Sequence, residues 1–327
     1  MKGLILCAGK GTRLYPFSEA TPKVLLPVAN KPILHYCIEQ LIKLQIREIG
    51  IVIRPEHLAL FMKEIGTGEQ WNLDITYIHQ LQPLGISNAV LQAESFILDE
   101  PFILLLGDNL ITESLEPLAQ AIHYDHHEIA IMLGNVANPQ DFGIAEIAGN
   151  RIVGLEEKPV SPKSNLAVLG AYAFSADIFK AIHAIRPSPR GEYEITDAIS
   201  WMINQGYSAV FHKTEQNYSD VGTMERWLEA NHWMLDQMDA DGLLNNRERL
   251  DECIIIPPVL IDPSALLRNC IIGPYVTIGP QVKLEGCHMD NCILLEGLEL
   301  LDTGTALSHA ILGAQFIYLQ TSGGTNK

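Results

Sequence analysis

A glycine-rich turn follows the apolar segment at the start of the chain, where residues 4–14 read LILCAGKGTRL. Such turns often hold phosphate through backbone N–H groups. A dinucleotide-binding turn would need a third glycine, but Leu14 stands there. A P-loop would need a glycine where Leu4 stands and a Ser or Thr where Gly11 follows Lys10. The turn is therefore either a phosphate site of a third type or an ordinary strand-to-helix turn.

Positive charge is concentrated near this turn in a chain that is otherwise acidic. The chain has 327 residues and a formal net charge of −17, so its field repels nucleic acid and anionic membranes. We expect neither as a partner. Within residues 1–31, however, a single acid, Glu19, is outnumbered by basic residues. These are Lys2, Lys10, Arg13, Lys23 and Lys31, which favour a local site for an anion, although a solvated charged face would look the same.

Two carboxylates in distant parts of the sequence could bind a metal ion. Asp108 ends the apolar run FILLLGD, and Asp220 lies in NYSDVGT just before a predicted helix. Mg²⁺ binds one or two carboxylates when phosphate oxygens and water supply its other ligands. Asp108 could equally form a turn and Asp220 could merely cap the helix.

A third charged motif, EEKP, places Glu157 beside Lys158 and before Pro159. Successive residues of a strand face opposite sides, so only one of the pair would reach a ligand unless the proline distorts the strand. Alone, such a pair is usually surface charge.

These residues need a scaffold, and residues 1–245 predict an α/β domain. Helical segments at 31–44 and 87–97 separate apolar strands, a second group of strands and a helix (194–205) follows, and residues 223–238 predict one helix. We expect a Rossmann-like, doubly wound, largely parallel but mixed sheet that binds ligands at the carboxyl ends of its strands. The predicted strands are residues 3–7, 48–53, 75–79, 102–107, 129–133, 152–159, 169–174 and 208–213.

The pattern changes in residues 246–327. Cys253, Cys270 and Cys287 recur every 17 residues, and six-residue units start at Ile272, Ile278 and Leu284. This spacing predicts a short left-handed β-helix domain, with an irregular β-rich tail as the alternative. So short a solenoid needs its end covered, so we expect a homo-oligomer.

Taken together and in this order, the motifs AGKGTRL, PKVLLPVANKPIL, LGDN, EEKP, RGEYEITD and SDVGT resemble the sugar nucleotidyltransferases, and among them the glucose-1-phosphate thymidylyltransferases. The resemblance covers roughly residues 1–240, and the β-helix resembles the longer members. It implies a nucleotide-diphospho-sugar transferase fold, a nucleoside triphosphate and a sugar 1-phosphate as partners, Mg²⁺ as cofactor, and a nucleotide sugar and pyrophosphate as products. The expected nucleotide is dTTP and the expected sugar is glucose 1-phosphate, with UTP or another sugar as the alternative.

The resemblance also assigns roles to residues. Catalysis is implied for Arg13, Lys23, Asp108 and Lys158, and metal binding for Asp108 and Asp220. Nucleotide binding is implied for Leu6, Ala8, Gly9, Gly11, Thr12, Arg13, Lys23, Gln80, Gly85 and Asp108. The sugar phosphate is implied to contact Gly143, Glu157, Lys158, Val168 and Arg190. CAGKG departs from the commoner AGGSG, and SDVGT from W-x-D-T-G.

The remaining features restrict the alternatives. No apolar run is long enough to span a membrane and no cleavable leader is visible, so a cytoplasmic location is expected. The six cysteines form no C-x-x-C pair and are expected as buried small hydrophobic residues. Three other interpretations remain. They are a nicotinamide-dependent oxidoreductase, for which the third glycine is missing, a regulatory homologue without activity, and acyl transfer by the β-helix. Against acyl transfer, the coil is short, and His288 and His309 are expected as surface or packed residues.

Overall fold

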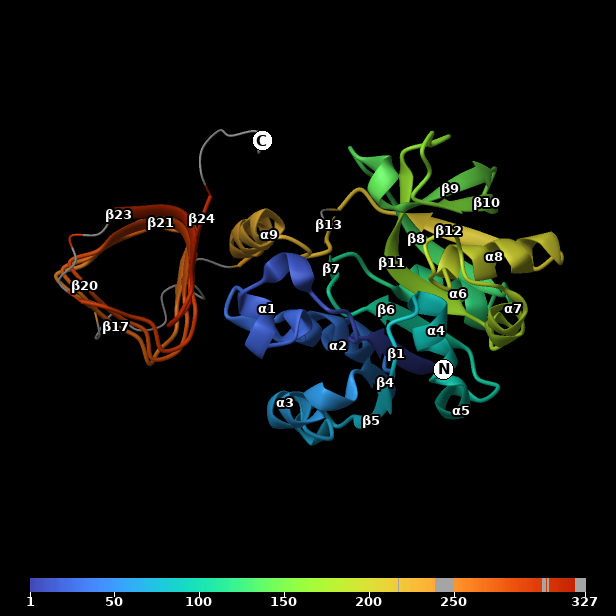
Figure 1. Cartoon of the computed structure of the whole chain (residues 1–327), viewed down its shortest axis with the longest axis horizontal. Coiled ribbons are helices and arrows are strands. Elements are labelled where there is room, and N and C mark those ends of the chain that lie inside the picture. The colour runs from blue at the N-terminus through green and yellow to red at the C-terminus, as the bar shows by residue number, and fades with distance from the viewer. Residues whose placement is uncertain (217, 239–249, 302–303, 305, 321–327) are drawn as a thin grey trace. The chain divides into compact units, whose positions relative to one another are not determined.

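The computed structural model describes residues 1–216, 218–238, 250–301, 304 and 306–320 (Figure 1). Its contacts divide the chain into two compact units, which we call unit 1 (Met1–Gly9 and Leu34–Tyr218) and unit 2 (Lys10–Ile33 and Ser219–Lys327). Residues 10–33 thus belong with the C-terminal part of the chain. The expected division at residue 245 lies outside the described residues and remains a prediction.

Unit 1 is built on a nine-stranded mixed sheet, with the order β5-β4-β1-β6-β11-β8-β12-β10-β9. The strands β5, β4, β1 and β6 are mutually parallel, whereas β11 runs antiparallel to both β6 and β8. The bounds are β1 Lys2–Leu6, β4 Glu48–Ile53, β5 Asp74–His79, β6 Phe102–Leu106, β8 Ile129–Asn135, β9 Gly143–Ala148, β10 Arg151–Glu157, β11 Leu166–Phe174 and β12 Ala209–Lys213.

Helices pack on both faces of this sheet. On one face, Leu4 of β1 shares a buried core with residues of α4, α7 and α8. On the other face, Gly3 leaves room for Leu41 of α2, because a Cβ at position 3 would lie 2.6 Å from Leu41 Cδ1. The alternation of side chains along β1 therefore supplies both layers. The helices are α2 Ile33–Lys43, α3 Leu58–Glu64, α4 Ile86–Leu91, α5 Glu94–Ile97, α6 Glu116–His123, α7 Ile178–Ala184 and α8 Ile195–Asn204.

The expected α/β architecture is confirmed, and each strand expected in residues 1–213 is present within a few residues of its expected bounds. One helical segment differs. Residues 87–97, expected as one amphipathic stretch, form α4 and α5, since Ala93 leaves the helical region between them with ψ 2°. No helix of the described residues is long and apolar enough to cross a membrane.

Unit 2 contains α1 (Phe17–Ala20), the hairpin β2–β3 (Pro27–Val28 and Lys31–Pro32) and α9 (Met224–Asp236). The expected helix at 223–238 is α9, which Thr223 caps by accepting a hydrogen bond from the backbone N–H of Arg226. A single helical turn, Thr12–Leu14, carries Arg13, and another, Lys23–Leu25, carries Lys23.

The C-terminal part of unit 2 forms stacked strands that are parallel to one another except for the last, which is antiparallel to its neighbour. We call them the strand stack (residues 250–301, 304 and 306–319; Figure 1, orange to red). Its first layers pair with the 17-residue spacing of the sequence, for example Ile254 with Ile271 and Leu267 with Leu284. Side chains that point inward, such as Ile272 and Met289, are fully buried. The strands are β14 Leu250–Asp251, β15 Ile254–Ile255, β16 Val259–Ile261, β17 Leu266–Arg268, β18 Ile271–Ile272, β19 Val276–Ile278, β20 Lys283–Glu285, β21 His288–Leu294, β22 Glu299–Leu300, β23 Ala306–Leu312 and β24 Ile317–Leu319.

Candidate functional site

Three residues expected to bind nucleotide lie at or just beyond the ends of strands at one edge of the unit 1 sheet. Leu6 ends β1, Gln80 follows β5 and Asp108 stands two residues beyond β6. The register pairs Leu6 with Leu106, so the ends of β1 and β6 are level. A Cβ at Gly107 would lie 2.6 Å from Cys7 Sγ, so only glycine lets the two strand ends approach this closely. The fold therefore places Asp108 beside the start of the glycine-rich turn.

Asp108 lies above a buried thiol. The side chain of Asp108 is half-buried, and the Cys37 thiol beneath it donates to the Asn109 carbonyl at 3.5 Å. Burial, and then the negative charge of Asp108, raise the pKa of Cys37 to about 12. Cys37 is therefore a neutral thiol at any physiological pH and is no nucleophile.

The segment expected to read the base is held rigidly within unit 1. Gln80 is only 6% exposed, and its Nε2 donates to Asn88 Oδ1 at 2.9 Å. Gly85 has φ +104°, and a Cβ there would lie 2.6 Å from the Tyr193 carbonyl oxygen. Both the backbone conformation and the lack of space require glycine. The Tyr193 N–H in turn donates to the Leu84 carbonyl at 2.8 Å, so the motif RGEYEITD fixes this segment.

The residues expected around the sugar phosphate are brought together at the same edge. Glu157 at the end of β10 pairs with Gly143 at the start of β9. A Cβ on Gly143 would lie 3.1 Å from Glu157 Oε2 and 3.8 Å from Val168 Cγ2. Arg190 Nη1 donates to Glu157 Oε1 at 3.4 Å, and Thr196 Oγ1 donates to Oε2 at 3.2 Å. Glu157 is thus a half-buried carboxylate, oriented by Arg190 and Thr196 and packed close to the backbone of Gly143.

Lys158 departs from the strand that precedes it. Its φ of +45° lies in the left-handed region, which is uncommon for a residue with a side chain and more so before proline. Its N–H donates to the Phe142 carbonyl at 3.0 Å, and the side chain is exposed. The chain turns at this point, so Glu157 and Lys158 are released from the strict alternation of a strand. Strained backbone of this kind persists where the surroundings fix it, and often at functional sites.

The basic residues of the turn are gathered within unit 2. Gly11 has φ +63°, and a Cβ there would lie 3.2 Å from Lys23 Cβ and 3.3 Å from Ser18 Cβ. Ser18 Oγ donates to the Gly11 carbonyl at 2.7 Å. The Arg13 guanidinium is close to the backbone of Gly222, where a Cβ would lie 2.8 Å from Nη2. Arg13 and Lys23 thus come from two short helical turns that belong to the same unit.

Asp220 forms an ion pair that the sequence did not suggest. Its Oδ1 accepts from Arg226 Nη1 at 2.5 Å, and both side chains are half-buried. Arg226 lies on the first turn of α9, so the pair joins the segment SDVGT to that helix. Arg226 compensates the charge of a carboxylate that is expected to bind a cation.

The donor set is compatible with Mg²⁺. The described residues contain no cluster of three His, Cys, Asp or Glu side chains that could hold a metal ion by themselves. Mg²⁺ needs only one or two carboxylates when phosphate oxygens and water supply the rest, and Asp108 in unit 1 and Asp220 in unit 2 are each of that donor type. The residues therefore suit a metal that arrives with a phosphorylated substrate rather than a permanent metal centre.

Three residues that orient expected site residues were not themselves expected at the site. Thr196, Asn88 and Arg226 orient Glu157, Gln80 and Asp220, respectively. Thr196 lies in the quoted motif RGEYEITD, which offered a signal. Asn88 and Arg226 depend on how a loop folds against a helix, and spacing alone does not give that.

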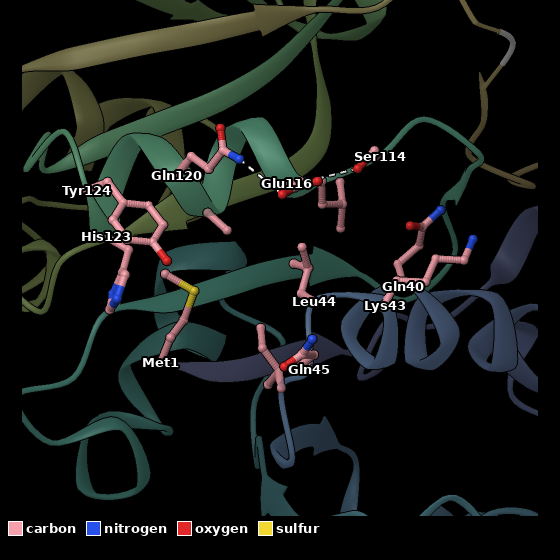
Figure 2. Close-up of a pocket in the computed structure, with 13 residues that line it drawn as sticks. Met1, Gln40, Lys43, Leu44, Gln45, Ser114, Glu116, Gln120, His123 and Tyr124 are labelled. Atoms are coloured by element: carbon pink, nitrogen blue, oxygen red, sulfur yellow. Dashed lines mark hydrogen bonds between the residues drawn. The ribbon is translucent and has the colours of Figure 1, made fainter.

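A separate cavity of about 560 Å³ lies between the end of α2 and helix α6 (Figure 2). Gln40 and Lys43 line it from α2, Leu44 lines it just beyond the end of that helix, and Glu116 and Gln120 line it from α6. None of the expected site residues is among its walls. The expected site residues therefore lie outside this cavity.

Comparison with known proteins adds independent information. The family model described as nucleotidyl transferase matches residues 2–237. A glucose-1-phosphate thymidylyltransferase of Streptomyces griseus is 37% identical over 272 residues, covering 82% of this chain and 75% of that protein. A Bacillus anthracis structure named as a glucose-1-phosphate thymidylyltransferase with sucrose superposes with a TM-score of 0.67 at 33% identity, covering 71% of this chain and 94% of that one. A UDP-glucose pyrophosphorylase with UDP-glucose superposes with a TM-score of 0.64 at 26% identity, covering 72% and 99%.

Proposed function

The chain belongs to the nucleotidyl transferase family, and from that membership we propose that it transfers the nucleotidyl group of dTTP to glucose 1-phosphate with Mg²⁺ as cofactor. That it is a sugar-1-phosphate nucleotidyltransferase follows from its relatives. The choice of dTTP and glucose is supported by the relatives named glucose-1-phosphate thymidylyltransferase. The single observation that carries the site is the group of Gly143, Glu157, Val168 and Arg190 at the carboxyl edge of the sheet.

UTP is the second candidate nucleotide. A structural neighbour is named as a UDP-glucose pyrophosphorylase. The buried amide of Gln80 could read the edge of either pyrimidine, because thymine and uracil present the same polar groups and differ by one methyl. A methyl group in a hydrophobic pocket discriminates by only about 10–200-fold. We therefore expect measurable activity with UTP and a higher kcat/KM with dTTP.

The proposed reaction needs no protein nucleophile. A phosphate oxygen of the sugar 1-phosphate attacks the α-phosphorus of the nucleotide, a new P–O bond forms, and the bond to the leaving pyrophosphate breaks. Both substrates are anions, so the protein has to hold them in line and offset their repulsion. Mg²⁺, when bound by Asp108 and Asp220, would supply further positive charge for the phosphates.

The chain's own residues divide this work. Arg13 presents a planar guanidinium to the triphosphate, and Lys23 packs against Gly11 and adds a second charge. Glu157, held by Arg190 and Thr196, accepts hydrogen bonds from sugar hydroxyls. Lys158 neutralises the sugar phosphate as a point charge. Leu6, Ala8, Gly9, Gly11 and Thr12 form the wall around the triphosphate.

A regulatory homologue without activity is the non-enzymatic alternative. It is disfavoured because both proposed metal carboxylates and both cations of the turn are present. An oxidoreductase is disfavoured because the third glycine of its turn is missing.

We further propose that the strand stack is the left-handed β-helix of the longer members and that it mediates homo-oligomerisation. Support comes from its 17-residue register and from exposed apolar side chains on its outer strands, among them Ile254, Ile317 and Leu319. Sedimentation velocity of the full chain tests the assembly. A single monomeric species at micromolar concentration would contradict it.

The function is tested by pyrophosphate release over a matrix of dTTP, UTP, CTP, ATP and GTP against the 1-phosphates of glucose, galactose, mannose and N-acetylglucosamine. Mass spectrometry identifies the product. We expect the highest kcat/KM for dTTP with glucose 1-phosphate, and we expect no pyrophosphate release without Mg²⁺. Asp108→Asn serves as the inactive control. If no pair of substrates released pyrophosphate, the proposed function would be contradicted. If kcat/KM were highest with UTP, the nucleotide would be reassigned.

A further inference from the structure

The strand stack contacts the segment that carries the phosphate-binding turn. Residues 10–33 cluster with residues 219–327 rather than with the strand that precedes them. This segment carries Arg13 and Lys23, the two cations proposed to bind the triphosphate. Two separate sets of contacts within unit 2 account for the clustering.

The first set holds the tip of the β2–β3 hairpin. Ala29 and Asn30 both have positive φ, +48° and +57°, which is the arrangement of a two-residue hairpin turn with left-handed residues at both positions. Glycine and asparagine favour that conformation, but alanine does not. Ala29 is 8% exposed and packs against Leu235 of α9 and Leu260 of the stack. A strained residue of this kind persists because its surroundings hold it.

A buried amide connects the hairpin, α9 and the stack. Asn231 of α9 is 2% exposed, and its Oδ1 accepts from the Ala29 N–H at 2.9 Å and from Thr277 Oγ1 at 2.9 Å. Thr277 lies on β19 of the stack and is 1% exposed. Asn30 Nδ2 donates to the Ile278 carbonyl of the same strand at 2.8 Å. Three elements thus meet at one oxygen atom that water does not reach.

The second set fixes the turn itself. Phe17 is buried and contacts Trp227 of α9 edge to face at 5.6 Å between ring centroids, and Phe316 of the stack at 6.1 Å. Trp227 Nε1 donates to the Pro27 carbonyl at 2.7 Å. Ser18, next to Phe17, donates to the carbonyl of Gly11. A shift of Phe17 would therefore also move Ser18, the next residue, which is hydrogen-bonded to the backbone of the turn at Gly11.

From these contacts we propose that the strand stack positions the phosphate-binding turn, with Asn231, Thr277 and Phe17 as positioning residues that act through Arg13 and Lys23. The inference rests on the proposed function in taking the turn as the triphosphate site. It assigns the stack a part in nucleotide binding, beyond assembly. None of these three residues touches the substrate in this proposal.

The test uses the full-length chain with substitutions on the stack. Thr277→Val removes the hydroxyl that donates to Asn231 and keeps the shape, whereas Thr277→Ser keeps the hydroxyl and serves as the conservative rescue. Ser308→Ala is the control on the same stack, because it removes an exposed hydroxyl whose hydrogen bond to Asp290 involves no residue of 10–33. Asn231→Leu is a second, stronger variant. Circular dichroism and thermal unfolding establish that each variant is folded at the assay temperature.

The expected result is a split between the two substrates. Thr277→Val should raise the KM for the nucleoside triphosphate about 3–10-fold and leave the KM for the sugar phosphate within about twofold, since only the turn is displaced. Thr277→Ser and Ser308→Ala should match the wild type. An unchanged triphosphate KM in both Thr277→Val and Asn231→Leu would overturn the proposal. So would a parallel loss of kcat that follows the folded fraction, because this is what a purely structural role predicts.

Equilibrium binding separates this proposal from the proposed function. Isothermal titration with Mg-dTTP and with inorganic pyrophosphate needs no turnover. If Thr277→Val binds both ligands more weakly and the wild type transfers no nucleotide, the positioning role is supported and the proposed function is contradicted. If the variant binds both ligands as the wild type does and the wild type is active, the proposed function is supported and the positioning role is contradicted.

Discussion

The guanidinium of Arg13 lies against the backbone of Gly222, so closely that a Cβ at position 222 would approach Nη2 to 2.8 Å. The two residues are distant in sequence, yet both belong to unit 2. The glycine of SDVGT thus leaves the space that the arginine of the turn occupies. This contact gives the SDVGT segment a role in placing a cation in addition to that of Asp220.

Gly222→Ala is expected to impair activity without much loss of stability. The atom that the new methyl group meets is the far end of a flexible side chain, so the protein relaxes by moving Arg13, and we expect unfolding free energy to change by about 0.5 kcal/mol or less. The displaced guanidinium should lower kcat by about tenfold or more. Urea unfolding and steady-state kinetics check both parts. A fully active Gly222→Ala enzyme would show that the position of Arg13 does not matter for the reaction.

Arg13→Ala is expected to reduce turnover on the order of a hundredfold, because negative charge grows on the leaving pyrophosphate in the transition state. Arg13→Lys keeps the charge but not the fork and should recover only part of the activity. Single-turnover rates at saturating substrates measure the effect. A loss confined to KM would mean that Arg13 contributes only ground-state binding.

Lys158→Ala is expected mainly to raise the KM for the sugar phosphate, by about tenfold, with a smaller fall in kcat. The exposed side chain follows a half-buried carboxylate, Glu157, that lies close to the backbone of Gly143. Each substrate is varied in turn at saturation of the other. If the nucleotide KM rises instead, the assignment of Lys158 to the sugar phosphate is wrong.

Asp108→Asn is expected to slow transfer on the order of a hundredfold or more by weakening Mg²⁺ binding. Asn is isosteric and is accommodated in the same turn, so folding should be retained. Titration of activity with Mg²⁺ and Mn²⁺ checks the cause. Near-wild-type turnover at saturating Mg²⁺ would remove Asp108 from the metal site.

Glu194 is expected to make stability fall as pH rises. Burial, the largest cause, raises the pKa of this carboxyl in the folded chain, although hydrogen bonding from Ser188 acts in the opposite direction. The folded state then binds the proton more tightly than the unfolded state, so the stabilisation is complete below the ordinary pKa and is lost as pH rises through the raised value. Urea unfolding at pH 4.5 and pH 7 compares the wild type with Glu194→Gln. The variant should lose less stability over this interval, and equal losses would contradict the prediction.

The sequence predicted those features of the fold and the site that depend only on the local backbone conformation or on the burial of a short segment. Periodicity predicted the strands, because β4 and β6 are buried on both faces and read as continuous apolar runs. Gly11 and Gly85 were identified from motifs, and the structure gives the physical reason, since both have positive φ. The pairing of Asp220 with Arg226 and of Glu157 with Thr196 was not predictable, because it depends on which loop meets which helix.

The same limit explains why the sequence did not indicate that residues 10–33 cluster with the C-terminal segment. Composition changes near residue 246, where the repeat begins, and a boundary placed by composition follows that change. Phe17 and Ala29 look like ordinary apolar residues of a loop. Their partners, Phe316 and Asn231, are far away in the sequence and come close only when the chain folds. No local sequence pattern therefore predicts that residues 10–33 cluster with the C-terminal segment.

The contact of Asn30 with Ile278 also has a consequence for biosynthesis. The carbonyl that accepts its hydrogen bond is 248 positions later in the chain. At a synthesis rate of about 5–20 residues per second, the hairpin is synthesised roughly 12–50 s before that partner. Throughout this interval the left-handed turn at Ala29 lacks the contacts that hold it. Nascent chains should therefore acquire the sheet of unit 1 first, and a competent triphosphate site only when translation of the strand stack is nearly finished.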